Sequence, residues 1–279
     1  MPPKTSDSYI LPTLRGQHCF VLESNVGLWR SLFEVVKEFI DEIVLEVTPR
    51  GIQLESFDKM SVALLNLHLK PNMFKHYEVS NSESPMVPLE IKLNVVELLR
   101  VIKCGSDMDL IRFSIKENDK DTLIINIAGA TKSRFALACL DYVDVNRVEA
   151  MDLDIYDHHE RMSVSEFTHV VKNLRGFGDA VSIDLCQDKS GTVSLCVLST
   201  TGEGIRKAEF SIELQNAKDQ DCKACLSNEY LTKVAKMLSL SKDTFMLHLD
   251  SEGRPCVFQV EIGGGLGEMT VYVCQRELH

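Results

Sequence analysis

The stretch Gly27-Leu-Trp-Arg-Ser-Leu-Phe-Glu-Val-Val-Lys-Glu-Phe-Ile-Asp41 has apolar residues at helical spacing and predicts an amphipathic helix. Two segments of alternating polarity follow it, residues 42–47 and 51–55, and Thr48-Pro-Arg-Gly51 supplies the turn between them. A helix followed by a strand pair recurs along the chain every ~60–70 residues. Repeated units bury their apolar faces against one another, so this pattern decides the fold.

The other three helices are predicted at residues 94–104, 165–176 and 228–238. About ten hairpin-linked strands accompany the four helices. We therefore predict an α+β fold, with two similar domains of antiparallel sheets that carry helices on one face. The predicted parts are a disordered N-terminal extension at 1–17, a domain at 18–140, an extended acidic connector at 141–157 and a domain at 158–279.

The composition limits the classes of protein that the chain could belong to. Its 279 residues suffice for two domains with their own cores. A net charge of −11 argues against nucleic-acid binding over the whole surface, although a basic stripe on one face remains compatible with it. We expect no membrane association, because no apolar run approaches ~20 residues and the N-terminus lacks a signal-peptide core. The nine cysteines then indicate reduced thiols in the cytosol, the nucleus or a viral replication site.

Each predicted helix carries basic residues on the side opposite its apolar face. For any single helix this could be no more than a solvated charged face. Its recurrence on all four helices of an acidic protein favours a positive surface that contacts phosphates without reading sequence. The candidate residues are Arg30, Lys37, Arg100, Lys103, His169, Lys172, Arg175, Lys233 and Lys236.

Three motifs could carry chemistry, but each fits a structural role better. Cys222-Lys-Ala-Cys225 has zinc-like spacing without a second ligand pair, and the glycine run at 263–267 lacks the Lys-Ser/Thr of a phosphate-binding loop. In His158-His159-Glu160, neighbouring side chains of a strand point to opposite faces, so at most one histidine can join the glutamate. We expect a surface cluster there, and we predict no catalytic residue, no metal and no cofactor. A metal-dependent enzyme that uses these three residues stays open as an alternative.

The segment Gly51-Ile-Gln-Leu-Glu-Ser-Phe-Asp-Lys-Met-Ser-Val-Ala-Leu-Leu-Asn-Leu67 resembles a signature stretch of the eukaryotic-type sliding clamps, the proliferating cell nuclear antigen family. The resemblance continues at residues 37–42, 102–105, 167–181 and 255–272, so it covers nearly the whole chain from about His18. It implies a DNA polymerase processivity factor: a non-enzymatic ring, commonly a homotrimer, that encircles duplex DNA in the nucleus or at a viral replication site. A subunit of the heterotrimeric DNA-damage checkpoint clamp, which shares this fold, is the nearest alternative.

The resemblance also implies roles for particular residues. The basic helix residues become DNA contacts inside the ring, and the implied partners are DNA polymerase, other replication and repair proteins with clamp-binding peptides, and a clamp loader. The implied partner-peptide pocket consists of Phe57, Met60, Val62, Val148, Ala150, Met151, Pro255, Tyr272 and Val273. Edge strands at about 131–140 and 202–212 would pair between subunits, with Phe135, Ala136, Ile205 and Ala208 at the contact.

Overall fold

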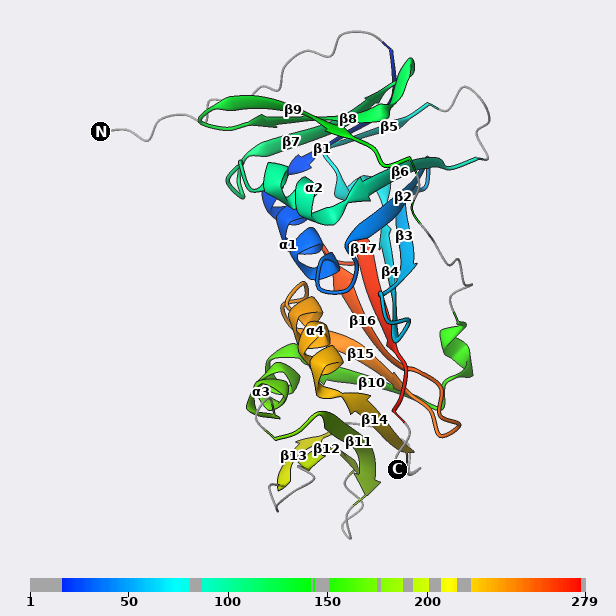
Figure 1. The fold of residues 1–279 in the computed structure, drawn as a ribbon. Coiled ribbons are helices and arrows are strands. Elements are labelled where there is room, and N and C mark those ends of the chain that lie inside the picture. The colour runs from blue at the N-terminus through cyan, green and yellow to red at the C-terminus, as the bar shows by residue number, and fades with distance from the viewer. Residues whose placement is uncertain are drawn as a thin grey trace, which may run out of the picture. The chain divides into compact units, whose positions relative to one another are not determined.

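The computed structural model describes residues 17–80, 87–141, 143, 151–174, 177–187, 193–200, 207–214 and 222–276. The chain divides into two compact units, Met1–Leu54 with His68–Val145 and Glu55–Leu67 with Asn146–His279 (Figure 1). Strands β3 (Gly51–Phe57) and β4 (Ala63–Leu69) therefore contribute residues to both units. The division after Val145 falls inside the connector that we expected at 141–157, whereas residues 55–67 group with the second unit.

The first unit contains a five-stranded antiparallel sheet with the strand order β5-β1-β7-β8-β9. A second group pairs β2 with both β3 and β6. Helices α1 and α2 pack against each other (Figure 1). The bounds are β1 (His18–Asn25), α1 (Val26–Val36), β2 (Glu42–Thr48), η1 (Pro71–Met73), β5 (His76–Val79), β6 (Leu89–Asn94), α2 (Val95–Ile102), β7 (Leu110–Lys116), β8 (Asp119–Ala128) and β9 (Lys132–Ala138).

Trp29 organises the core of the first unit from the buried face of α1. Its ring stacks on Phe33 at 5.6 Å and meets Phe113 edge-on at 5.0 Å between centroids. Its indole N–H donates to the hydroxyl of Ser24 at 2.6 Å, so the polar atom of this buried side chain is satisfied. The apolar stripe that the opening stretch predicts is therefore the face that α1 buries.

The second unit contains two antiparallel sheets, with the strand orders β10-β15-β16-β17-β4 and β13-β12-β11-β14. Helices α3 and α4 pack against each other, and Phe167 of α3 contacts Phe245 and Phe258 in the core. The bounds are η2 (Leu153–Ile155), β10 (His158–Ser163), α3 (Val164–Leu174), β11 (Ala180–Gln187), β12 (Val193–Thr200), β13 (Lys207–Glu213), β14 (Cys222–Ser227), α4 (Asn228–Leu238), β15 (Thr244–Leu249), β16 (Cys256–Ile262) and β17 (Gly267–Val273).

The predicted fold class is confirmed: the described chain is α+β, with four α-helices and antiparallel sheets. The first helix ends at Val36 instead of Asp41, because the N–H groups of Glu38 and Phe39 bond carbonyls three residues back and tighten the last turn. The strand count of about ten was too low, since seventeen strands lie in the described residues. No helix among those residues is both long and apolar enough to span a membrane.

Candidate functional site

The basic residues on the helices of the first unit lie close to acidic side chains. Arg30 donates a hydrogen bond to the carbonyl of Gly105, and this contact holds α1 against the loop after α2. Lys37 caps the C-terminal end of α1 and is half-buried. The ion pairs join Arg30 Nη1 to Asp107 Oδ1 at 2.6 Å, Arg100 Nη1 to Glu97 Oε1 at 2.7 Å, and Lys103 Nζ to Glu34 Oε1 at 3.1 Å. Much of the positive charge predicted for this helix pair is therefore compensated.

The basic residues on the helices of the second unit have different surroundings. Lys172 is exposed and forms no ion pair within the described part of the chain. His169 contacts Asn173 at 3.0 Å, and Lys236 lies in the last turn of α4. Lys233 does have an acidic partner, because its Nζ lies 2.9 Å from Glu229 Oε1 and 4.4 Å from the ring centre of Tyr230. Arg175 lies outside the described residues.

Asn228 fixes the relative position of α3 and α4. Its buried side-chain amide donates to the carbonyl of Leu174 at 3.0 Å and to that of Gly178 at 2.8 Å. The carbonyl of Leu174 lies in the last turn of α3, where carbonyls have no hydrogen-bond partner within their own helix. One buried side chain at the start of α4 thus completes the end of α3. This contact holds the two helices next to each other.

Several of the implied pocket residues meet in an apolar cluster of the second unit. We call it the apolar cluster: Leu64, Tyr156, Val257 and Tyr272 are buried, and Phe57, Met151 and Leu153 pack against them. The hydroxyl of Tyr156 donates to the carbonyl of Pro255 at 3.0 Å, and that of Tyr272 donates to the carbonyl of Met151 at 3.3 Å. Phe57, Met151, Pro255 and Tyr272 are therefore brought together, and their role as a peptide pocket stays a prediction.

The remaining pocket candidates have different environments. Met60 is 76% exposed at the turn between β3 and β4, while Val62 is half-buried and Val273 is a core residue. Val148 and Ala150 lie outside the described residues. Sequence reasoning missed Leu64, Leu153, Tyr156 and Val257. The β16–β17 hairpin register, which sets Val257 opposite Tyr272, could have identified Val257.

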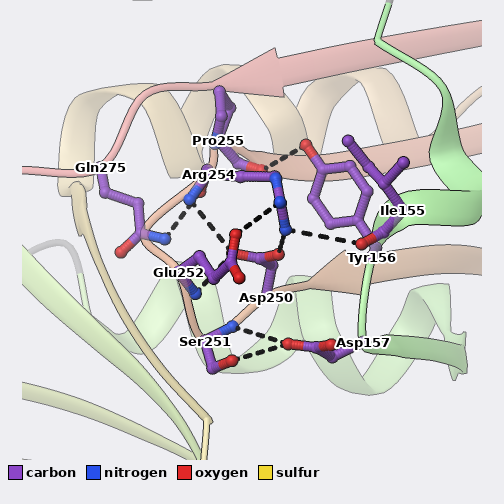
Figure 2. Close-up of polar contacts among 9 residues, drawn as sticks. All are labelled: Ile155, Tyr156, Asp157, Asp250, Ser251, Glu252, Arg254, Pro255 and Gln275. Carbon is purple, nitrogen blue, oxygen red and sulfur yellow. Dashed lines mark hydrogen bonds and ion pairs between the residues drawn. The ribbon is translucent and has the colours of Figure 1, made fainter.

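Polar contacts attach the connector segment that carries Tyr156 to the turn between β15 and β16, as Figure 2 shows. Arg254 pairs with the buried carboxylate of Asp250 and also donates to the carbonyl of Ile155 at 3.5 Å. On the other side of the turn, the hydroxyl of Ser251 donates to Asp157 Oδ2 at 2.7 Å. Hydrogen bonds from Ser251 lower the pKa of the Asp157 carboxyl. These contacts place Tyr156, and with it one wall of the apolar cluster.

The two strands that the resemblance implies for subunit contacts both lie at sheet edges. β9 is the last strand of the five-stranded sheet, and β13 is the last strand of the four-stranded one. On β9, Phe135 is half-buried and Ala136 is exposed; on β13, Ala208 is 8% exposed. Ile205 lies outside the described residues. Within the described chain each of these strands pairs on one side only, which leaves an edge that another strand can bind.

The motifs considered for catalysis or metal binding have structural positions. His158 and Glu160 are buried on one face of β10, so the expected surface cluster is wrong for both, and of the three residues only His159 lies on the other face. Cys222 and Cys225 are buried in β14, and burial raises the pKa of the Cys222 thiol to about 11, which disfavours the thiolate that binds metals. Gly263, Gly264 and Gly265 all have positive φ in the turn between β16 and β17. Among the described residues, no three His, Cys, Asp or Glu side chains are grouped to hold a metal ion.

Antiparallel sheets with a packed helix pair in each unit, whose outward sides carry the basic residues, define the class of DNA clamps. A family model described as "Proliferating cell nuclear antigen, N-terminal domain" matches residues 22–158. Proliferating cell nuclear antigen 1 of Plasmodium falciparum is 23% identical over 252 residues, which cover 86% of each chain. The probable DNA polymerase sliding clamp 2 of Paramecium bursaria Chlorella virus 1 is 24% identical over 232 residues, 82% of this chain and 80% of that one.

Solved structures support the same assignment at the level of the fold. The proliferating cell nuclear antigen of Entamoeba histolytica has a TM-score of 0.80 at 18% identity, covering 94% of this chain and 100% of that one. The PCNA2–PCNA3 complex of Sulfolobus tokodaii has a TM-score of 0.76 at 16% identity, covering 92% and 99%. The chain is a divergent PCNA-like sliding clamp, and its function is that of a DNA polymerase clamp.

Proposed function

We propose that this chain is one subunit of a closed ring, a homotrimer, that encircles duplex DNA and tethers DNA polymerase and other replication or repair proteins. The observation that carries the proposal is the packed helix pair in each unit, with basic side chains on the outward side. The ring performs no chemistry: enclosure prevents escape, and weak phosphate contacts allow sliding. We place its action in the nucleus or at a viral replication site, where a clamp loader would open and close it.

The apolar cluster is the proposed docking site for the partners' peptides. It contains three aromatic side chains, Phe57, Tyr156 and Tyr272, together with aliphatic residues. Aromatic and aliphatic anchors of a partner would fill the space beside them, as in other peptide-binding surfaces. Because a ring has several subunits and holds DNA, tethering raises the local concentration of a bound polymerase, so modest peptide affinities suffice.

A closed ring should be retained on circular DNA and lost from linear DNA. After loading by the cognate clamp loader onto a singly nicked plasmid, the protein should co-elute with the plasmid from a sizing column. A single restriction cut before the column should release it, because the ring slides off the new ends. Retention that is equal on both DNA forms would contradict topological binding, and so would retention that disappears on both forms in high salt.

The ion pairs predict that the individual basic residues on the helices contribute unequally to DNA binding. The variant Lys172→Gln should reduce the slope of log affinity against log salt by about 0.9, which is the contribution of one phosphate contact. The matched variant Arg100→Gln should change the slope by less than half as much, because Arg100 already pairs with Glu97. Fluorescence anisotropy with a duplex over a range of KCl concentrations measures both slopes. Equal changes would show that the ion pair opens on DNA.

A further inference from the structure

Two imidazoles meet on the sheet face of the second unit that bears the exposed side chains of β10. His159 of β10 and His248 of β15 are direct partners in the strand register, and their Nδ1 atoms are 2.7 Å apart. The ring of Tyr156 contacts that of His248 at 6.1 Å, and Val257 is the cross-strand neighbour of His248. Tyr156 and Val257 belong to the apolar cluster. The histidine pair therefore lies directly beside the proposed peptide pocket.

The hydrogen bonds of the pair determine where it can take up a proton. His248 Nε2 lies 3.2 Å from Gln259 Oε1, and an amide oxygen only accepts, so Nε2 carries the hydrogen. Neutral His248 then has its lone pair on Nδ1. The N–H on Nδ1 of His159 donates a hydrogen bond to this lone pair. This arrangement leaves the lone pair of His159 on Nε2 of an exposed ring. A proton can bind there without breaking any hydrogen bond of the network.

Burial lowers the pKa of His248 and so favours its neutral form. Nearby charges act in both directions: Glu268 of β17 favours protonation of His248, and Glu160 interacts with His159 from within β10. Arg161, two residues along β10 on the same face, is exposed and has no ion pair within the described chain. The charged or titratable groups around the pair are thus Tyr156, Glu160, Arg161 and Glu268. The surface hollow that Arg161 lines also contains Lys242, Asp243 and Glu261.

We propose that His159 and Arg161 form an anion subsite that extends the peptide pocket and selects partner segments with acidic residues next to their apolar anchor. The inference rests on the proposed function, since it takes the apolar cluster as the pocket. Side chains two positions apart on one strand face are about 7 Å apart. Alternate residues of an extended peptide have the same separation. The matching motif is therefore two acids separated by one residue, and a carboxylate next to protonated His159 gains a charge-assisted hydrogen bond.

The test uses the full-length protein and two fluorescein-labelled peptides. Both peptides contain the same apolar anchor, through which the wild-type chain binds them. One peptide continues with Glu-Ala-Glu and the other with Gln-Ala-Gln. We expect the Glu peptide to bind about fivefold more tightly at about pH 6 than at about pH 8, and the Gln peptide to change by less than about twofold. Glutamate stays ionised over this interval, so the change reports the imidazole.

Variants separate the roles of the two cations. His159→Gln can still donate to His248, so the fold should be kept, but it should abolish the pH dependence of the Glu peptide. Arg161→Gln should weaken the Glu peptide about threefold at both pH values. Lys223→Gln, which removes an exposed cation of β14, is the matched control and should change neither peptide. Thermal unfolding checks that all three variants are folded.

The possible outcomes distinguish the subsite from the pocket. If the Glu peptide keeps its pH dependence in His159→Gln, or if it never binds more tightly than the Gln peptide, the subsite is refuted while the pocket stands. If Tyr272→Ala, folded by the same criterion, leaves the binding of both peptides unchanged, the apolar cluster is not the pocket. The subsite then fails together with that part of the proposed function.

Discussion

Replacing Lys132 and Arg134 by glutamate should convert the assembled protein into monomers. Both residues are exposed on β9, the free edge of the five-stranded sheet. The free edge of the four-stranded sheet, β13, exposes Glu209 and Glu213 instead. In the proposed ring, the cationic edge of one copy would pair with the anionic edge of the next, which would place opposite charges next to each other. Glutamates on both edges would place like charges together.

Like charges at an interface cost several kcal/mol, so about 3 kcal/mol would weaken each contact about 100-fold. Sedimentation velocity at several protein concentrations measures the change. Lys75→Glu, an exposed cation beside the opposite edge of the same sheet, is the control and should remain assembled. Adding Glu209→Lys and Glu213→Lys to the double variant should restore assembly, because the signs are then reversed on both edges. A double variant that keeps the wild-type mass would place the subunit contact elsewhere.

The helices and most strands could be predicted because their periodicity is set by one buried face. The helix at Asn228–Leu238 agrees to the residue, since Tyr230, Val234 and Met237 repeat at helical spacing. β1 was missed because it lies between β5 and β7 and buries four consecutive residues, Cys19 to Leu22, so that no alternation appears. β5 has four residues, too few for a period to show.

The candidate site was only partly predictable, because charge compensation is a tertiary property. Arg30 and Asp107 lie 77 residues apart, and no local pattern shows that they pair. The same holds for the apolar cluster, whose members come from β3, β4, the connector, β16 and β17. His159 was interpreted together with its sequence neighbours, whereas its partner is His248 across the β10–β15 register. The strand register decides whether His159 belongs with its sequence neighbours or pairs with a residue of the next strand. A single sequence specifies that register poorly.

Asp58 holds together the turn between β3 and β4, from which Phe57, Met60 and Val62 project. Asp58 is buried, with 5% of its surface exposed. One oxygen of its carboxylate accepts the N–H groups of Val62 and Ala63, both at 2.8 Å. The other oxygen accepts the N–H of Met60 at 3.3 Å and the hydroxyl of Tyr230. Burial and this bond to Asp58 raise the pKa of Tyr230, so its hydroxyl remains a donor.

Asp58→Ala should therefore destabilise the protein by about 3–4 kcal/mol, because it leaves several buried donors without an acceptor. That is a large fraction of the ~5–15 kcal/mol of a typical domain. Urea unfolding followed by circular dichroism measures the loss. Tyr230→Phe removes a single donor and should cost about 1–2 kcal/mol. Lys59→Ala, at an exposed position of the same turn, should change stability by less than about 0.5 kcal/mol. Because the turn carries one wall of the apolar cluster, peptide binding should weaken in Asp58→Ala even where the protein remains folded; unchanged stability and binding would show that the turn forms without this carboxylate.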